Sequence, residues 1–510
     1  MDIITLKSFI PEIFFSCAIL FQLVYNIRIV NNLKFNFPLI TKEIFFQTLF
    51  ILICLAYFYN DLKIEGFLSN FALVNDESTR VTKLIFILIT ICALFVIHEA
   101  FNVQKLNFFE YYSVLLFAVL SLLLMISATD LIFFYLTMEM QALCFYILAS
   151  FNRNSTFSVE AGLKYFVSGS FISGFYLLGC SLIYGSLGTL NLHDISLLTV
   201  FDIGTYSNEL NLLVLIGTIL ITSTLLFKLA CAPFHFWSPD VYDGAPIAST
   251  LAFSVLPKLA LFFFFIKWVT SLNTVFNSIS DVLLIFGILS AFLGTFFALN
   301  QTRLKRLIIY SSIAQTGFLV ASLSANNINS FTALYFFLLV YLITSILIWG
   351  HFIVFYKFHA KISEFYLKNL DSLFLSSVAN LFKTNSFWAF SFLLIFFSIA
   401  GIPPLTGFLS KMLIIYELVS SNYLIGAIAL IVISAVSVYY YIRMIKVVYF
   451  EPLKESRKTQ NDFTIVFLDE SLDRIYFLFA VLLFVLLVLF YFPTLFLTIC
   501  QYIVIHSFGF

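Results

Sequence analysis

The sequence predicts an all-α polytopic membrane protein with about fourteen transmembrane helices, and three observations support this fold class. First, 62% of the 510 residues are hydrophobic and only 11% are charged, less than half of the ~25% that is usual in soluble domains. Second, about fourteen apolar runs reach the ~20 residues that a bilayer-spanning helix needs. Third, two of the runs are interrupted by prolines, which break helices.

The apolar runs follow one another with short connections, and the longest polar stretch, about 449–474, joins the last two. The runs lie near 9–27, 40–60, 84–103, 111–128, 130–150, 161–186, 211–240, 246–268, 278–299, 306–325, 330–355, 386–421, 423–448 and 475–499. We therefore expect four parts: helices 1–3 in 1–105, a five-helix repeat (helices 4–8) in 106–270, a second, inverted repeat (helices 9–13) in 271–449, and a polar loop with helix 14 in 450–510.

The two interrupted runs are the strongest pointer to function. The run 386–421 would make a helix of roughly 54 Å, far longer than the ~30 Å hydrocarbon core, and it contains Pro403 and Pro404. The run 211–240 contains Pro233. These are helices 7 and 12, each the fourth of its repeat. An odd number of helices per repeat makes the two repeats inverted. Discontinuous helices at matching positions of inverted repeats indicate the ion path of a transporter.

The distribution of basic residues isolates three lysines. If the N-terminus is placed outside, the inner loops hold 19 of the 27 Lys and Arg residues, as the positive-inside rule requires. The outer side holds five, namely Lys7, Lys63, Arg80, Lys83 and Lys267. The remaining three lie inside apolar runs: Lys228, Lys258 and Lys411.

These three lysines are candidate proton-carrying groups. Lys258 is about twelve residues into the eighth helix, near the bilayer midplane, where burial disfavours the charged form and permits proton exchange. Lys228 directly precedes the first break and Lys411 follows the second; alternatively, both could extend to an interface. Glu139, about nine residues into the fifth helix, is the clearest mid-membrane acid, and we expect it to pair with Lys228.

Two histidines are possible proton relays. His235 lies at the first break and His351 at the end of the eleventh helix. For His235, a structural role in which the ring hydrogen-bonds a carbonyl freed by the break is an equally good interpretation.

Several classes of function are excluded. Lys plus Arg and Asp plus Glu both total 27, so no charge excess points to a nucleic-acid partner. No nucleotide-binding glycine loop or HExxH zinc motif is present. The seven cysteines lie in or beside apolar runs, and we expect no disulfide, zinc site or iron–sulfur cluster. Active transport would therefore use an ion gradient or redox energy from a partner.

Five sequence motifs resemble the proton-pumping antiporter-like subunits of respiratory complex I, and in particular the subunit 2 type (subunit N in bacteria). They run from the fourth helix to the twelfth: Glu160-Ala-Gly-Leu-Lys-Tyr-Phe, Ser181-Leu-Ile-Tyr-Gly, Phe227-Lys-Leu-Ala-Cys-Ala-Pro-Phe-His-Phe-Trp-Ser-Pro-Asp-Val-Tyr-Asp-Gly-Ala-Pro, Arg303-Leu-Lys-Arg-Leu with the following Tyr-Ser-Ser-Ile-Ala-Gln-Thr-Gly, and Gly401-Ile-Pro-Pro-Leu-Thr-Gly-Phe-Leu-Ser-Lys.

The resemblance implies a role for each candidate residue. Glu139 and Lys228 would end an input half-channel, Lys258 would be the central relay, and Lys411 would end the output half-channel. It implies no cofactor in this chain, because NADH, FMN, the iron–sulfur clusters and ubiquinone would be bound by other subunits. The expected neighbours are the lipid bilayer and membrane-arm subunits of the 4L and 4 types, with no nucleic acid.

Two other functions remain open. A multi-subunit cation/proton antiporter would share the broken helices and lysines but would need no NADH. A structural membrane-arm subunit would anchor its neighbours and pump nothing. The 67 Phe residues and the excess of Lys over Arg indicate an AT-rich genome, from which we expect the mitochondrial inner membrane, with a bacterial plasma membrane as the alternative.

Overall fold

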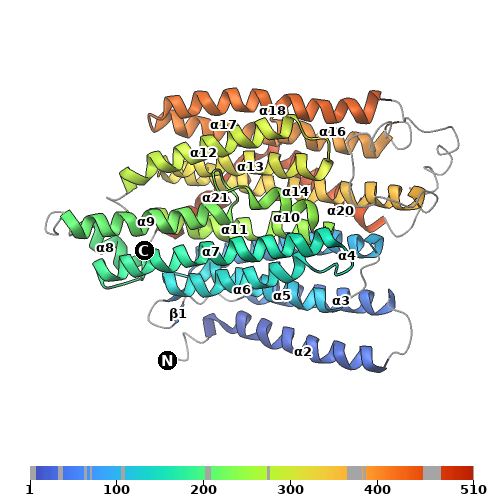
Figure 1. Cartoon of the computed structure of the whole chain (residues 1–510), viewed down its shortest axis with the longest axis horizontal. Coiled ribbons are helices and arrows are strands. Elements are labelled where there is room, and N and C mark those ends of the chain that lie inside the picture. The colour runs from blue at the N-terminus through green and yellow to red at the C-terminus, as the bar shows by residue number, and fades with distance from the viewer. Residues whose placement is uncertain are drawn as a thin grey trace. The chain divides into compact units, whose positions relative to one another are not determined.

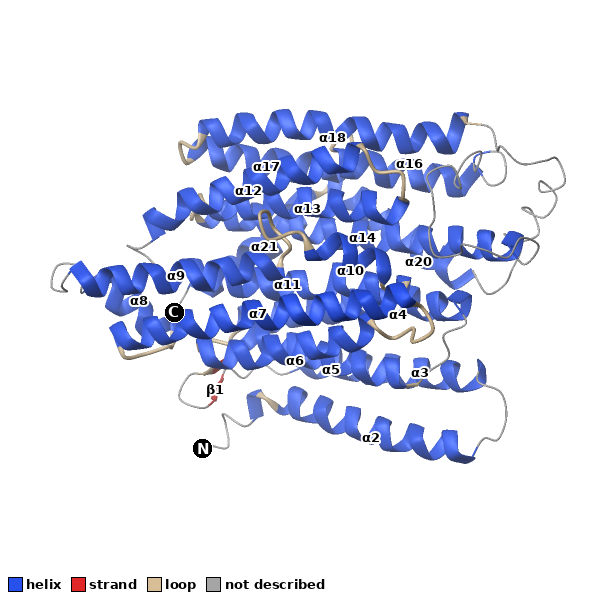
Figure 2. Cartoon of the chain, viewed as in Figure 1, coloured by secondary structure: helices blue, strands red, loops and turns tan. Residues whose placement is uncertain are grey.

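The computed structural model describes residues 7–32, 38–61, 66–68, 72–104, 109–201, 208–272, 276–363, 382, 386–451 and 473–508. Nearly all of these residues are helical (Figures 1 and 2), which confirms the predicted fold class. The chain divides into two compact units. Unit 1 comprises Met1–Leu94, Leu106–Leu283 and Gln501–Phe510, and unit 2 comprises Phe95–Lys105 and Leu284–Cys500.

The elements that lie mainly in unit 1 are α2 (Ile10–Asn32), α3 (Pro38–Asp61), β1 (Gly66–Leu68), β2 (Leu73–Asn75), α4 (Glu77–Gln104), α5 (Glu110–Ser127), α6 (Leu131–Ala149), α7 (Thr156–Leu187), α8 (Leu192–Phe201), α9 (Asn208–Lys228), α10 (Trp237–Gly244) and α11 (Ile247–Ser271). Those mainly in unit 2 are α12 (Phe276–Leu299), α13 (Leu304–Leu323), α14 (Ile328–Ser363), α16 (Ser386–Ala400), α17 (Thr406–Ser420), α18 (Leu424–Phe450) and α20 (Asp473–Tyr491). Helix α21 (Pro493–Phe508) has residues in both units.

The described helices make the chain a multi-pass membrane protein. Eleven of them are long and apolar enough to cross a bilayer, and counting the bent pair α20–α21 as one span gives twelve. Leu212–Lys228 and Ser386–Ala400 are apolar but shorter, because each is one half of a broken run. These lengths do not establish the predicted number of fourteen spans.

Helix α11 is the core of unit 1. Every residue of its spanning window is buried inside the protein, and it packs against α5, α6, α8 and α10. A helix that is apolar all round can be buried in a protein core or can face lipid, and α11 is of the first kind. Any polar side chain on α11 is therefore held away from lipid. In unit 2, α17 packs against α13, α14, α16, α18 and α20, but one face of it, with Phe408, Met412 and Tyr416, is exposed.

Both predicted helix breaks are present. Helix α9 ends at Lys228 and α10 begins at Trp237, while α16 ends at Ala400 and α17 begins at Thr406. Each break contains one residue with a left-handed backbone, Ala230 (φ 56°) in the first and Gly401 (φ 83°) in the second.

The fold differs from the sequence prediction in three places. The run 475–499, expected to form one continuous helix, instead forms two, α20 and α21, which meet at 89°. Pro493 lacks an amide hydrogen and disfavours the helical conformation of the preceding residue, an effect that average hydropathy does not register. The short helix α8 and the antiparallel hairpin β1–β2, with Phe67 opposite Val74, were also not predicted.

Helices α12 and α13 pack closely through small residues. Gly287 and Gly294 of α12 face Ala321 and Ala314 of α13, and a Cβ atom added at any of these glycines would lie within 3 Å of the opposite backbone. Such close approach is the usual packing mode of membrane helices, since lipid provides no hydrophobic driving force for helix association.

We expect Gly317→Ala to destabilise unit 2. The added Cβ atom would lie 2.5 Å from the backbone nitrogen of Ala291 and 2.6 Å from the carbonyl oxygen of Gly287, so the two helices must separate. Overpacking of this kind costs about 1–3 kcal/mol. Thermal inactivation of the purified assembly measures the effect. Gly174→Ala is the matched control, because its Cβ atom meets nothing within 4 Å; equal stability of the two variants would contradict the expectation.

Candidate functional site

The first break lies in unit 1, where α9 stops at Lys228. The break frees carbonyl groups at the end of α9, and these have no water to bond inside a bilayer. Trp237, the first residue of α10, turns back and its indole Nε1 donates a hydrogen bond to the carbonyl oxygen of Phe227 at 3.1 Å. The backbone nitrogen of Cys231 donates to the carbonyl oxygen of Leu226 at 2.9 Å. The chain therefore satisfies these two carbonyls without using the lysine.

Lys228 pairs with Glu139, as predicted. The Nζ atom of Lys228 lies 3.9 Å from the Oε1 atom of Glu139 on α6, with side chains that are 4% and 23% exposed. This distance is too long for a hydrogen bond and is at the outer limit of an ion pair. A small movement of either side chain would therefore tighten or break the pair.

Lys258 is buried at the middle of α11, as the twelfth residue of that helix. It directly follows Pro257, which cannot donate the helical hydrogen bond to the carbonyl of Phe253. The hydroxyl of Tyr242, on α10, donates to that same carbonyl oxygen at 3.3 Å. Helix α10 thus repairs the backbone one turn before Lys258, which gives a structural reason for the tyrosine in the motif.

Lys411 lies on α17 in unit 2 and binds the end of the preceding half-helix. Its Nζ atom donates hydrogen bonds to the carbonyl oxygens of Ile399 (2.9 Å) and Ala400 (3.0 Å), the last two residues of α16. The side chain also passes close to Gly401, where a Cβ atom would lie 3.1 Å from its Cδ atom. The carbonyl end of a helix carries a partial negative charge, so it stabilises the ammonium ion.

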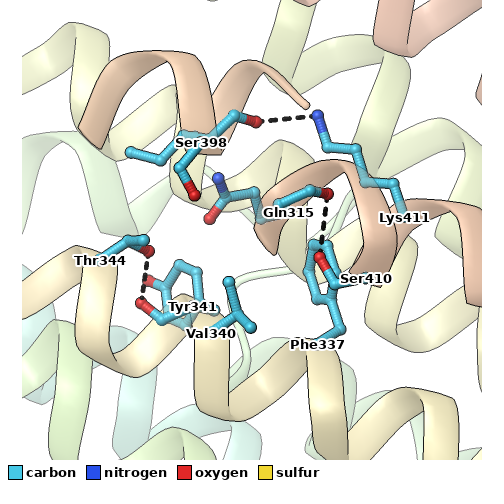
Figure 3. A pocket seen from close by; sticks show the side chains of 10 residues that line it. Gln315, Phe337, Val340, Tyr341, Thr344, Ser398, Ser410 and Lys411 are labelled. Atoms are coloured by element: carbon cyan, nitrogen blue, oxygen red, sulfur yellow. Dashed lines mark hydrogen bonds between the residues drawn. The ribbon is translucent and has the colours of Figure 1, made fainter. Parts of the chain in front are cut away.

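A small pocket adjoins Lys411 (Figure 3). Its volume of about 10 Å³ for a water-sized sphere is close to the space that one water molecule needs. Polar side chains from α13, α14, α16 and α17 line it, including Gln315, Tyr341, Thr344, Ser398 and Ser410. A water molecule in this space would have hydroxyl and amide partners and could exchange a proton with Lys411.

The two histidines are both buried. The ring of His235 hydrogen-bonds the carbonyl of Pro233 within the break, the arrangement that the structural interpretation expects. His351 on α14 lies 2.9 Å from the carbonyl oxygen of Leu347 and 2.9 Å from the hydroxyl of Ser391, and it stacks on Trp388. These contacts fix each ring, and a relay role for either histidine stays a prediction.

Lys83 and Lys267 were placed in outer loops from the sequence, and the structure buries both. Helix α4 begins at Glu77 rather than near 84, and α11 continues to Ser271 rather than 268. Hydropathy windows miss polar helix ends, although the acidic Asp76-Glu77 pair before Ser78 and Thr79 is a helix-start signal. Three of the five basic residues assigned to outer loops, Arg80, Lys83 and Lys267, therefore lie on helices.

No group of three or more His, Cys, Asp or Glu side chains in the described ranges could hold a metal ion. The charged groups described above are lysines and single carboxylates, side chains that can bind and release protons.

Comparisons with known proteins identify the family of the chain. A family model described as NADH:quinone oxidoreductase/Mrp antiporter, transmembrane, matches residues 128–437. The chain is 32% identical over 465 residues to NADH-quinone oxidoreductase subunit N of Pelagibacter ubique, covering 90% of this chain and 92% of the relative. It is 31% identical over 449 residues to NADH-ubiquinone oxidoreductase chain 2 of Marchantia polymorpha, covering 87% and 88%.

Among solved structures, a chain of the Mrp complex from a Dietzia species has the same fold, with a TM-score of 0.77 at 18% identity, covering 99% of this chain and 98% of that one. The shared fold therefore extends beyond the matched family segment to the whole chain. The sequence relatives define the family more narrowly than the fold does. The chain belongs to the NADH:quinone oxidoreductase/Mrp antiporter family, in the group of NADH-quinone oxidoreductase subunit N and NADH-ubiquinone oxidoreductase chain 2.

Proposed function

We propose that this chain is a proton-translocating membrane-arm subunit of NADH:ubiquinone oxidoreductase, complex I. The observation that carries the proposal is the burial of Lys228, Lys258 and Lys411 inside the apolar helix bundle, two of them at helix breaks. Ionisable groups inside a membrane are energetically unfavourable, and they mark ion pathways when they are not displaced to an interface. The sequence relatives, which carry the names of complex I subunits, support the same assignment.

The Glu139–Lys228 pair loads the proton. While the pair is closed, the carboxylate stabilises the ammonium form of Lys228. When the pair opens, Lys228 loses that stabilisation and gives up its proton. The 3.9 Å separation supports this role, because the two atoms are close enough to attract each other but share no hydrogen bond that must first be broken.

Lys258 then relays the proton and Lys411 releases it. Lys258 receives the proton on the fully buried helix α11, where no lipid headgroup or bulk water competes for it. Lys411 holds the proton against the carbonyl oxygens of Ile399 and Ala400, and it passes the proton to water in the adjoining pocket. Redox energy from quinone reduction elsewhere in the complex drives the opening and closing of the Glu139–Lys228 pair.

The chain itself does no redox chemistry in this proposal. NADH, FMN, the iron–sulfur clusters and ubiquinone are bound by other subunits. The neighbours are membrane-arm subunits of the 4L and 4 types, in the mitochondrial inner membrane or, if the chain is bacterial, the plasma membrane. The bacterial and plant relatives are about equally similar and so favour neither location.

The second candidate is a subunit of a multi-subunit cation/proton antiporter. The similar fold of the Mrp complex chain favours it, since both functions use this arrangement of helices. The two functions differ in their energy source, because an antiporter requires a sodium or other cation gradient and no NADH.

Native gel electrophoresis separates the two candidates. Gently solubilised membranes are stained for NADH oxidation and probed for this chain. We expect the chain to migrate with a large NADH-oxidising band. Migration in a smaller band without that activity would favour the antiporter, and sodium-driven proton exchange in vesicles would then be the next measurement.

We expect Lys258→Arg to block pumping without preventing assembly. Arginine keeps the positive charge but cannot be deprotonated in proteins, so it cannot relay a proton. Proton uptake by inverted vesicles and the rate of NADH oxidation should both fall by roughly a hundredfold, the lower end for loss of a positioned proton donor. Lys164→Arg is the control, because Lys164 is 46% exposed and pairs with Glu160. Normal pumping by Lys258→Arg would refute the relay role.

We expect Glu139→Gln and Lys228→Met to have non-additive effects on the same two rates. Either change alone abolishes the switching pair. When two residues act as one unit, the second substitution causes no further loss of rate. Each single variant should slow coupled turnover by roughly a hundredfold, and the double variant should be no slower than the worse single one. Glu160→Gln, an exposed acid on α7, is the control. A double variant whose loss equals the product of the two single losses would mean that Glu139 and Lys228 act independently.

A further inference from the structure

A second buried Glu–Lys pair lies in unit 1, where α2 and α4 begin. The Nζ atom of Lys83 donates hydrogen bonds to Oε1 of Glu12 and to Oδ1 of Asn75, both at 2.5 Å. The side chains of Lys83 and Glu12 are 0% and 7% exposed. This pair is therefore shorter and more deeply buried than the Glu139–Lys228 pair.

A third ionisable group, Lys267, is buried within electrostatic reach of this pair. The Nζ atom of Lys267 donates to the carbonyl oxygen of Ile126, near the end of α5, at 3.1 Å, and it lies 4.7 Å from the ring centre of Phe263. Asp76 attracts the charge of Lys267 and Lys83 repels it. Two ammonium groups thus share this region with the carboxylates of Glu12 and Asp76. We refer to Glu12, Lys83 and Lys267 as the Lys83 cluster.

Further charged groups surround the cluster without entering it. Glu77 forms an ion pair with Arg80 one turn along α4, at 3.3 Å. His506 of α21 lies 3.8 Å from the same carboxylate, which also accepts a hydrogen bond from the hydroxyl of Tyr502. These groups are partly exposed.

Stability does not explain the Lys83 cluster. Replacing a buried ion pair with well-packed apolar residues is often neutral or stabilising, because desolvation of the two charges offsets their attraction. A membrane protein with 62% hydrophobic residues has apolar alternatives in abundance. Buried ionisable groups in a membrane bundle are by default a functional site.

The location of the cluster indicates its side of the membrane. It lies at the end of unit 1 that holds the start of α2, the start of α4 and the end of α11. By the positive-inside rule this is the outer end, because few basic residues occupy its loops. Helix α11 carries both Lys258 and Lys267, nine residues and roughly 14 Å apart along the axis. The relay lysine and the cluster are therefore on one rigid element.

We propose that the Lys83 cluster is a second proton-exchanging site, which releases a proton at the outer end of unit 1. The inference rests on the proposed function. Lys83 passes a proton from Nζ to the carboxylate of Glu12, and the ionic pair becomes a neutral pair with no change in total charge. The Glu12 carboxyl group then gives the proton to outside water, and Lys83 is reprotonated from the interior. Lys267 assists because its charge repels that of Lys83 and so favours the loss of a proton.

The decisive variant is Lys83→Arg in the complete complex in inverted vesicles. Arginine keeps the charge and the pairing with Glu12 but cannot lose a proton. We expect assembly on native gels as in the unmodified complex, with coupled proton uptake and NADH oxidation lower by roughly a hundredfold. If the ion pair is purely structural, Lys83→Arg should pump normally, because arginine would preserve the pair. Arg80→Met, on the same helix, is the control and should pump normally.

The double variant Glu12→Gln and Lys83→Met covers the case in which arginine does not fit. It keeps the side-chain volumes and removes both charges, so the buried pair is replaced without leaving one charge alone. We expect it to assemble and to pump as poorly as Lys83→Arg. Normal pumping by either variant would overturn the proposal, and so would failure of both variants to assemble, which would assign the pair a structural role.

Lys258→Met in parallel separates this inference from the proposed function. If Lys258→Met abolishes pumping while the variants of the Lys83 cluster pump normally, only the release site is refuted. If Lys258→Met also pumps normally, the proposed function itself fails.

Discussion

The site depends on one constraint: a carbonyl group freed at a helix break in a membrane must find a donor inside the protein. The chain meets this constraint differently at its two breaks. At the first, Trp237 donates to the carbonyl of Phe227. At the second, Lys411 itself donates to the last two carbonyls of α16. Because the backbone amides of Ala230 and Cys231, together with the indole, donate to the carbonyls freed at the first break, Lys228 remains available to a carboxylate, Glu139.

Helix α10 links the two lysines of unit 1 through the same constraint. It has only eight residues, yet Trp237 at its start repairs α9 beside Lys228, and Tyr242 near its end repairs α11 one turn before Lys258. A displacement of α10 would therefore disturb the backbone next to both lysines at once. The long motif in this region is accounted for by backbone repair, and only its lysine is a proton carrier in the proposed mechanism.

The sequence was sufficient for the features that depend on local chemistry. Apolar runs placed the helices, prolines placed both breaks, and depth within a run identified Lys258 and the Glu139–Lys228 pair. The sequence was insufficient where tertiary contacts or polar helix ends determine the structure. The bend at Pro493 joins two apolar segments that a hydropathy window merges. Lys83 lies in the second turn of α4, in a polar helix end that was assigned to a loop. Its partner Glu12 is 71 residues away on another helix, a distance that no local pattern spans.

The partners of the lysines differ in what they can do with a proton. A carboxylate can accept it, so the pairs Lys228–Glu139 and Lys83–Glu12 can each exchange a proton internally and pass between ionic and neutral states. A backbone carbonyl can only accept a hydrogen bond. Lys411, which is held by two carbonyls, must therefore give its proton to a hydroxyl group or to water. The pocket beside Lys411 has space for about one water molecule and hydroxyl groups in its wall, and it can therefore supply such an acceptor. In the proposed mechanism, the paired lysines of unit 1 therefore exchange a proton with a carboxylate, and Lys411 of unit 2 passes its proton to water, because their hydrogen-bond partners differ.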